Sequence, residues 1–350
     1  TFDEDEYYWN YIYRKGEEPN VETFNIPMSP SFYEIIQKDG TENFTEDPNA
    51  TGALRYDGKF IYTTSGCIYV KMKRMNYFHG EEVGYSSDEI EDVLNGNVTE
   101  YFDSTEALRG IINFFDTDEM ININLRRNGL YLVSGTLSFE KSNICIIGHG
   151  SQIRVWNPIL SNDGYYVLIG YSGRSGVKNV EICDLTFQGL MKYENGAIAN
   201  AKEQCISFGK MLFPTNMTFY EVNIDGFETG VHISNETYSD KPLDIRFIDC
   251  NVSRTMFGYN FKASKQVLVS GGSVDNSLSM TDQHHCIYVS TGSNDITVEN
   301  CLLKNSTGAA IHQMGGSKPT KMENNHYRNL TINNCFDGIV FGGYTLKSSA

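Results

Sequence analysis

A stretch of the chain, DNSLSMTDQHH from Asp275 to His285, concentrates side chains that could carry out acid–base chemistry. Asp275 and Asp282 supply carboxyl groups, and His284 supplies an imidazole. Two carboxyl groups hydrolyse a glycosidic bond when they lie about 5–5.5 Å apart for retention of configuration, or about 6.5–9.5 Å apart for inversion. We therefore take Asp275, Asp282 and His284 as catalytic candidates. An alternative for Asp282 is that it caps its own turn.

Glu203 is a fourth catalytic candidate, and it lies in a second loop that runs from Gln188 to Gln204. Strand positions that should face outward offer no two carboxylates at the hydrolase spacings. A catalytic pair must therefore use loop residues such as Glu203 or Glu194. A lyase would instead need a base, such as Lys262 or a histidine, and a positive group to neutralise a uronate. Hydrolysis is favoured, and lyase chemistry stays open.

Five residues on short strands could bind a sugar. Sugars present flat apolar faces that stack on an aromatic ring, and hydroxyl groups that pair with amide, imidazole and ammonium groups. The substrate-binding candidates, all predicted to face outward, are His232, Asn260, Lys262, Tyr288 and His312. A solvated outer face of a sheet would show the same mixture, so the binding interpretation depends on how the strands are aligned.

An internal repeat predicts that these strands are stacked. Six segments align without gaps: NVEICDLTF from Asn179, NMTFYEVNI from Asn216, DIRFIDCNV from Asp244, QVLVSGGSV from Gln266, DITVENCLL from Asp295 and NLTINNCFD from Asn329. The second and fourth positions are apolar, the sixth is polar or Gly, and the seventh is apolar or small. Strand side chains alternate between two faces, so this change of phase predicts a corner at which the same side stays inward.

A third short strand follows each segment, which gives three strands per turn of a coil. The third strands are CISFG from Cys205, GVHIS from Gly230, GYNFK from Gly258, CIYVS from Cys286, GAAIH from Gly308 and GIVFG from Gly338. Each coil would bury its inner face by stacking on its neighbours, with parallel strands about 4.8 Å apart. We predict an all-β fold, a parallel β-helix of three-strand coils, in which the two loops wall one groove. A β-sandwich would need two-residue hairpin turns, which are scarce here.

The eight cysteines show neither a Cys-x-x-Cys motif nor a zinc-type spacing. Cys250, Cys301 and Cys335 occupy the seventh position of their segments and should form one inward column. Cβ atoms on adjacent rungs would lie about 4.8 Å apart, beyond the usual disulfide range of roughly 3.5–4.5 Å. We predict reduced thiols packed as small hydrophobic side chains. The sequence indicates no cofactor and no metal site, although calcium is compatible with the many oxygen ligands.

The residues before the repeat fit the same architecture. DSTEALRGIINFF from Asp103 predicts a capped amphipathic helix. An extended strand GLYLVSGTL and a turn with glycines at Gly148 and Gly150 follow. With helix, strand, turn and repeat in this order, residues from about 103 to 344 resemble the pectate-lyase-like right-handed β-helix superfamily. Within it they look most like bacteriophage tailspikes, preneck appendages and related polysaccharide depolymerases.

This resemblance implies a right-handed parallel β-helix with a short N-terminal capping helix. It also implies a homotrimer that binds and cleaves cell-surface or capsular polysaccharide, located on a virion tail or outside the cell. Gly148-His149-Gly150 matches one piece of the polygalacturonase motif set, but the other pieces are not reproduced. That family's catalytic residues are therefore not carried over to this chain. The clustered Asp and Arg of calcium-dependent pectate lyases are not evident either.

Residues 1–100 differ from the repeat. The N-terminal stretch is acidic and aromatic, the sequence from Arg55 predicts two strands around a turn, and SSDEIEDVLNG from Ser86 predicts a short helix. We predict a small α+β extension over 1–100, which could attach the protein to a virion tail, and a β-helix over 101–350. Because no cap follows the last repeat strand, we expect the β-helix to continue beyond 350.

Charge narrows the range of partners, and three functions stay open. The formal net charge of −16 repels phosphate backbones and anionic lipid heads, so nucleic acid and membranes are poor partners. The favoured function is a depolymerase of host cell-surface polysaccharide. The first alternative is a non-catalytic structural or glycan-binding spike for host adsorption. The second is a cellular secreted polysaccharide lyase, against which the predicted free thiols argue, because exported proteins usually pair their cysteines.

Overall fold

The computed structural model divides into two compact units. It describes residues 9–11, 33–37, 54–55, 59–60, 69–72, 92, 95, 97, 103–113, 118, 120–125, 127–156, 166–171, 176–194, 197–199, 203–209, 215–234, 243–281, 283–315 and 322–342. The first unit comprises 1–134, 141–154 and 182–185, and the second comprises 135–140, 155–181 and 186–350. In the described part of the chain, no helix is long and apolar enough to cross a bilayer. The domain boundary predicted at residue 100 stays a prediction.

The first unit contains the predicted N-terminal helix. Its elements are β1 Trp9–Tyr11, β2 Tyr33–Gln37, β3 Leu54–Arg55, β4 Lys59–Phe60, β5 Tyr69–Met72, α2 Thr105–Ile112, β6 Ile121–Asn124, β7 Leu130–Val133 and β9 Ile144–Val155, which ends one residue beyond the unit. The Asp103 carboxylate accepts a hydrogen bond from the Thr105 backbone N–H at 2.9 Å, so the helix starts as its sequence predicts. Leu108 and Ile112 are buried on its inner side. Most of the predicted α+β extension lies outside the described residues.

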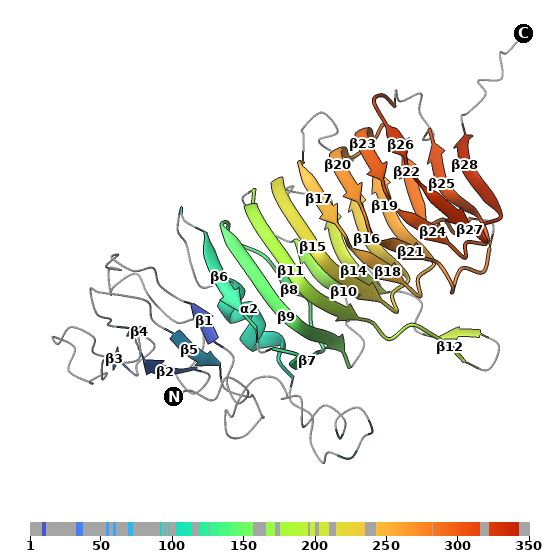
Figure 1. The fold of residues 1–350 in the computed structure, drawn as a ribbon. Coiled ribbons are helices and arrows are strands. Elements are labelled where there is room, and N and C mark those ends of the chain that lie inside the picture. Colours follow the sequence, from blue (N-terminus) through green and yellow to red (C-terminus); the bar gives the residue numbers. More distant parts are fainter. Residues whose placement is uncertain are drawn as a thin grey trace, which may run out of the picture. The chain divides into compact units, whose positions relative to one another are not determined.

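The second unit is built almost entirely of short strands (Figure 1). Its strands are β8 Leu137–Ser138, β10 Tyr166–Tyr171, β11 Lys178–Gln188, β12 Lys192–Glu194, β13 Ala197–Ala199, β14 Glu203–Gly209, β15 Thr215–Asp225, β16 Thr229–Ser234, β17 Ile245–Ile248, β18 Asn251–Ser253, β19 Phe257–Lys262, β20 Lys265–Ser270, β21 Ser273–Asp275, β22 Ile287–Ser290, β23 Asn294–Glu299, β24 Leu302–Lys304, β25 Ala309–Met314, β26 His326–Arg328, β27 Thr331–Asn333 and β28 Asp337–Gly342. Four residues of β11, Ile182–Leu185, belong to the first unit by their contacts.

Successive coils stack as parallel strands. We number the coils by the six aligned segments, the first of which lies on β11. The others are coil 2 (β15, β16), coil 3 (β17–β19), coil 4 (β20–β22), coil 5 (β23–β25) and coil 6 (β26–β28). Each coil pairs in parallel with the next through its first, second and third strands. The second unit is therefore all-β with parallel sheets, as predicted, and has the arrangement of a parallel β-helix.

The core is a set of inward files that the apolar second and fourth positions create. Met217, Ile245, Val267 and Ile296 pair in register on successive first strands, and each is at most 2% exposed. In the neighbouring file the rings of Phe219 and Phe247 stack with centroids 4.8 Å apart. Burying one such side chain contributes about 1.5–3 kcal/mol, so the stacking of coils holds the fold together.

The predicted corners are present at the sixth position. Asp184, Glu221, Asp249 and Asn300 all have positive φ, between 51° and 56°. Gly271 occupies the corner of coil 4 with φ 75°, and a Cβ at the following Gly272 would come within 1.9 Å of the Cys250 carbonyl oxygen. The left-handed conformation is costly for most residues and cheapest for Gly, Asn and Asp. This preference explains the polar or Gly pattern in the sequence.

The predicted register of coil 6 is wrong by five residues. Thr297 pairs with His326 and Val298 with Tyr327, so the sixth segment begins at Asn324 and not at Asn329. Asn325 therefore stands opposite Ile296, where an apolar side chain was expected. Its side chain accepts a hydrogen bond from the Ile296 N–H at 3.0 Å and donates to the Ser293 carbonyl at 3.0 Å. These side-chain bonds replace backbone pairing just before β26. This explains why a polar residue stands where the repeat predicts an apolar one.

The cysteine column is correspondingly shorter than predicted. Because Leu302 pairs with Thr331, Leu330 and not Cys335 lies beside Cys301. None of the cysteines in the described residues forms a disulfide, in agreement with the predicted thiols. Burial raises the pKa of Cys250 to about 12 and that of Cys301 to about 11. Both thiols therefore stay protonated and pack as apolar groups.

Candidate functional site

The third strands bring four of the five substrate-binding candidates into one outer column. Ser207, His232, Asn260, Tyr288, His312 and Val340 pair in register from β14 to β28. Lys262 lies in the adjacent column and pairs with Ser290. The sequence alignment had placed Ala310 beside Tyr288, and this is wrong by two residues, because His312 is the partner. The correction brings Tyr288 and His312 onto neighbouring strands.

A ring cluster forms where the loop from Asp275 reaches the third strand of coil 4. The His285 ring stacks on Tyr288 with centroids 5.5 Å apart and meets His312 edge-on at 4.5 Å. Tyr288 and His312 are also edge-to-face at 5.5 Å. His285 is 5% exposed, whereas Tyr288 and His312 are half-buried. The cluster therefore has a fixed base and two rings that reach the surface.

Hydrogen bonds to the backbone and between rings hold this cluster. The Ala309 N–H donates to His285 Nδ1 at 3.0 Å, and His285 Nε2 lies 2.8 Å from His312 Nδ1. Tyr288 donates its hydroxyl to the Met314 sulfur at 3.5 Å, a weak acceptor that a ligand oxygen could replace. Contacts within the protein thus hold the rings of His285, Tyr288 and His312 in place.

The pKa values of His284, His285 and His312 are lowered, so these three histidines are uncharged at neutral pH. Burial, with His312 and His284 nearby, lowers the pKa of His285 to about 4. Burial also lowers the pKa of His312, against an opposing effect of Asp337, and lowers the pKa of His284. The pKa of Tyr288 is raised by burial, with Lys262 acting in the opposite direction. The cluster therefore offers neutral hydrogen-bonding groups beside one ammonium group.

His284, a predicted catalytic residue, lies next to this cluster. Its Nδ1 accepts a hydrogen bond from the Met280 N–H at 3.0 Å, and its ring meets Phe257 edge-on at 5.2 Å. Asp282, the predicted general acid, lies outside the described residues. Its catalytic role therefore stays a prediction.

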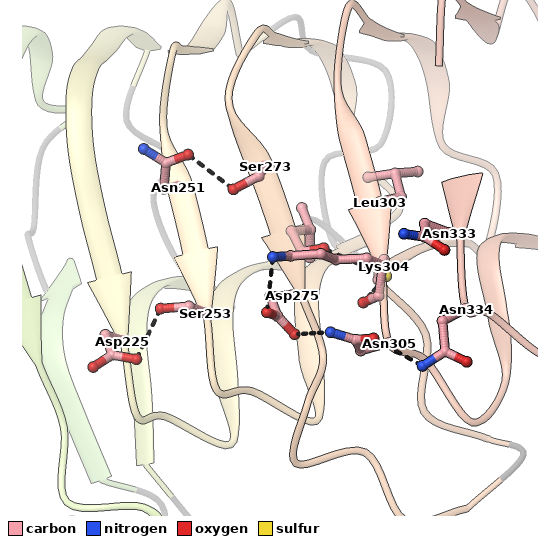
Figure 2. Close-up of polar contacts among 12 residues, drawn as sticks. Asp225, Asn251, Ser253, Ser273, Asp275, Leu303, Lys304, Asn305, Asn333 and Asn334 are labelled. Atoms are coloured by element: carbon pink, nitrogen blue, oxygen red, sulfur yellow. Dashed lines mark hydrogen bonds and ion pairs between the residues drawn. The ribbon is translucent and has the colours of Figure 1, made fainter. Parts of the chain in front are cut away.

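Asp275 belongs to a polar ladder on the second strands (Figure 2). Its carboxylate lies 3.2 Å from the Lys304 ammonium and accepts a hydrogen bond from the Asn305 side chain at 2.9 Å. Equivalent side-chain bonds join Asp225 to Ser253 on the preceding coils. Each of these contacts links one coil to the next, so the geometry gives Asp275 a structural explanation.

Glu203 is the most perturbed carboxyl group of the described residues. It is buried at the start of β14, and its Oε2 accepts a hydrogen bond from the Leu190 N–H at 3.1 Å. Its Oε1 is buried and meets no hydrogen-bond partner in the described part of the chain. Burial raises its pKa to about 7, against the opposing Leu190 bond. Glu203 can therefore carry a proton at neutral pH, as a general acid must.

Asp275 and Glu203 cannot form a catalytic pair within one chain. β14 pairs with β16, β16 with β19 and β19 with β22, and Asp275 belongs to the coil of β22. Three rungs correspond to about 14 Å, which exceeds both hydrolase spacings of about 5–9.5 Å. Each residue stays a separate candidate.

The sequence analysis underestimated His285 and did not find its neighbour Phe257. Tyr259 pairs with Ile287, so Cys286 stands opposite Gly258 at the start of the third strand, as the aligned segments predict. His285 then sits one residue earlier, where its ring turns toward the outer column. The cross-strand register would have revealed this role. The predicted groove between the two loops stays a prediction.

Whether this face binds a metal ion is untested. Within the described ranges, no group of three or more His, Cys, Asp or Glu side chains could hold a metal ion. The Nδ1 atoms of His284, His285 and His312 instead take part in hydrogen bonds within the protein. The compatibility with calcium that the sequence suggested is untested.

Comparisons with known proteins find similarity only among solved structures. No family model matches the chain, and no curated protein matches it. ORF18 of Geobacillus virus E2 is similar with a TM-score of 0.31 and 14% identity, over 70% of this chain and 59% of that chain. A proposed glycosyl hydrolase from Parabacteroides merdae has a TM-score of 0.23 and 13% identity, over 60% of this chain and 80% of that chain. Both scores are too low to carry a functional argument, which therefore depends on the residues above.

Proposed function

We propose that this chain binds a cell-surface polysaccharide along the outer column of its third strands, with Asn260, Tyr288 and His312 as sugar contacts. The observation that carries the proposal is the register of these residues on three successive parallel strands. An amide, an aromatic ring and an imidazole thus repeat along one line about 4.8 Å per strand. A polymer of sugar rings presents its apolar faces and hydroxyl groups in a similar repeating line.

The context that we propose is a bacteriophage tailspike or appendage with a right-handed, pectate-lyase-like β-helix. Stacked parallel coils and the sequence resemblance over about 103–344 support this context. The spike would be a homotrimer on the virion tail or otherwise outside the cell, attached through its N-terminal region. A net charge of −16 opposes binding to nucleic acid or membranes.

We propose hydrolysis of the bound polymer as a second function, and the raised pKa of Glu203 is the observation that favours it. Glu203 has a pKa of about 7 and therefore keeps a proton that it could give to a leaving sugar oxygen. Its partner carboxylate would come from residues outside the described ones or from a neighbouring subunit of the trimer, because the loop that holds Asp282 belongs to coil 4, about three rungs from β14. Lyase chemistry would use Lys262 or a histidine instead. Without either reaction the chain is an adsorption spike.

Binding can be tested with purified protein and a panel of bacterial capsular and wall polysaccharides in a glycan array, followed by titration calorimetry. We expect one polymer to bind and Tyr288→Ala to weaken it. The matched control is Tyr220→Ala, because Tyr220 is 42% exposed on the first-strand side. Equal loss in both variants, or no binding by any polymer, would contradict the proposal.

Catalysis is tested by incubating the same polymers with the protein and measuring products. New reducing ends without ultraviolet absorbance indicate hydrolysis, and absorbing unsaturated ends indicate a lyase. We expect hydrolysis that Glu203→Gln abolishes while binding persists. Binding without either product would leave the adsorption function and exclude the enzyme.

A further inference from the structure

Two histidines of the outer column are held in the same way by different partners. In His232 on β16 and in His312 on β25, the ring atom Nδ1 contacts a side chain of the preceding coil. The partner of His232 is the Gln204 side chain, at 3.2 Å. The partner of His312 is His285, at 2.8 Å. This difference decides which ring nitrogen of each histidine carries the proton.

The tautomer of His312 follows from the backbone. The Ala309 N–H donates to His285 Nδ1, so Nδ1 of His285 has no proton and a neutral His285 carries its proton on Nε2. That Nε2–H can only donate to His312 Nδ1. A neutral His312 must therefore carry its own proton on Nε2 and present a hydrogen-bond donor.

His232 is in the opposite state. The Gln204 contact is made by the amide oxygen Oε1, which only accepts hydrogen bonds, so His232 Nδ1 must donate. A neutral His232 therefore has an unprotonated Nε2, which is an acceptor. The two histidines thus hold their protons on different ring nitrogens, Nε2 in His312 and Nδ1 in His232.

The donor atom of His312 belongs to a half-buried side chain. No hydrogen bond from His312 Nε2 to any described residue is present, whereas its Nδ1 is bound to His285. On the next strand Gly342 pairs with Met314, and a Cβ built at Gly342 would lie 3.3 Å from His312 Nε2. Because glycine has no side chain, residue 342 does not fill the space beside His312 Nε2.

We infer that His285 is a positioning residue that fixes His312 as an Nε2–H donor, so that the subsite beside Tyr288 takes a sugar oxygen that accepts a hydrogen bond. This inference rests on the proposed function for the identity of the ligand. The arrangement of the two rings does not depend on it. Carbonyl and carboxylate oxygens, which only accept, fit this subsite best.

The tautomer can be measured directly. The full chain labelled with ¹⁵N-histidine gives ring-nitrogen chemical shifts, and the His312 signals are assigned by their loss in His312→Gln. We expect the wild-type protein to show His312 protonated on Nε2 alone. In His285→Gln the amide can accept from Ala309 and donate to His312, so the same tautomer is expected. In His285→Ala a second, Nδ1-protonated form should appear.

Affinity supplies the second readout, with the polysaccharide that binds the wild-type protein as the probe. Loss of one fixed donor weakens binding by about tenfold in His285→Ala, and His285→Gln should restore affinity to within about twofold of wild type. Gly342→Val should weaken binding while leaving the tautomer unchanged, because it covers Nε2. Thermal unfolding and circular dichroism show which variants are folded, and His285→Gln keeps the test valid if His285→Ala is not.

The outcomes separate the inference from the proposed function. A wild-type His312 protonated on Nδ1, or a His285→Ala protein with an unchanged pure Nε2–H tautomer, overturns the role of His285. If the tautomers respond as expected but no polysaccharide binds the wild-type protein, the proposed function fails and the positioning role stands. If the polymer binds at Tyr288 and His285→Ala leaves both readouts unchanged, the positioning role fails and the binding function stands.

Discussion

Two groups of aromatic rings in this molecule are built on the same parallel register but lie on opposite sides of the sheets. Inside, Phe219 stacks on Phe247 at 4.8 Å, and Phe247 meets Tyr259 edge-on at 5.2 Å. Outside, His285 stacks on Tyr288 at 5.5 Å and meets His312 edge-on at 4.5 Å. Parallel stacking of coils thus produces ring ladders on both faces.

The difference between the groups lies in their polar atoms and their exposure. The inner rings are at most 1% exposed, and in the described residues the Tyr259 hydroxyl has no hydrogen-bond partner. The outer rings are fixed through the Ala309 N–H and the bond between His285 and His312. Apolar burial explains the inner group, whereas the outer group uses hydrogen bonds to hold two half-buried rings at the surface. We therefore expect changes inside to alter stability and changes outside to alter binding.

The largest expected effect is on the inner group. Phe247→Ala removes a buried ring and leaves a cavity between two coils, so the free energy of unfolding should fall by about 3–5 kcal/mol. The control is Phe341→Ala on coil 6, where the ring is 69% exposed, and it should change stability by no more than about 1 kcal/mol. Urea unfolding followed by circular dichroism measures both. Equal losses in the two variants would show that the coils are not packed as described.

Glu203 tests whether a carboxyl group on a strand of the outer column can affect stability as the buried rings do. Its pKa is raised from 4.5 to about 7, so between these values the folded chain binds a proton that the unfolded chain has lost. The free energy of unfolding should therefore fall as pH rises from about 4.5 to 7, by about 3 kcal/mol in total. Glu203→Gln should remove this dependence and be the more stable protein above pH 7. Glu181→Gln, at an exposed position, is the control, and an unchanged pH profile in Glu203→Gln would refute the assignment.

The inner group is also the part that the sequence predicts well. Apolar residues at two alternating positions, and Asp, Asn or Gly at the corner, predict stacked coils because stacking buries these side chains together. Asp103 at the start of α2 was readable for the same reason, since one local hydrogen bond suffices. Local periodicity and caps therefore indicate the all-β, parallel-stranded fold class from the sequence.

The outer group was less readable because it depends on exact register between distant segments. GAAIH contains small residues that fit either face, so the alignment around Ala310 slipped by two and hid the contact between Tyr288 and His312. In coil 6 the residues NLTINN have the apolar pattern of the repeat but do not begin the segment. The segment begins at Asn324, and the side-chain bonds of Asn325 hold its first residues. The hydrogen bond from Ala309 to His285 has no sequence signature at all, because it joins a backbone group to a side chain on another coil.

Tyr288 should show the reverse of the behaviour expected for Phe247. Tyr288→Ala removes a half-buried ring from the outer cluster, and affinity for the bound polysaccharide should fall by about ten- to a hundredfold. Tyr288→Phe keeps the ring and gives up only the bond to the Met314 sulfur, so most of the affinity should remain. Titration calorimetry measures affinity, and thermal unfolding measures stability. A Tyr288→Ala variant that binds normally would remove the outer group from the ligand site.

The smallest expected effect concerns a third group of side chains, the polar ladder that holds Asp275. Asp275→Asn removes the ion pair with Lys304 but leaves an oxygen that can still accept from Asn305. Because both charged side chains are partly exposed, stability should fall by no more than about 1 kcal/mol, and less in high salt. The same variant separates the two interpretations of Asp275. If it keeps normal stability but abolishes cleavage of the bound polymer, Asp275 is a catalytic carboxylate and the structural explanation of its contacts is incomplete.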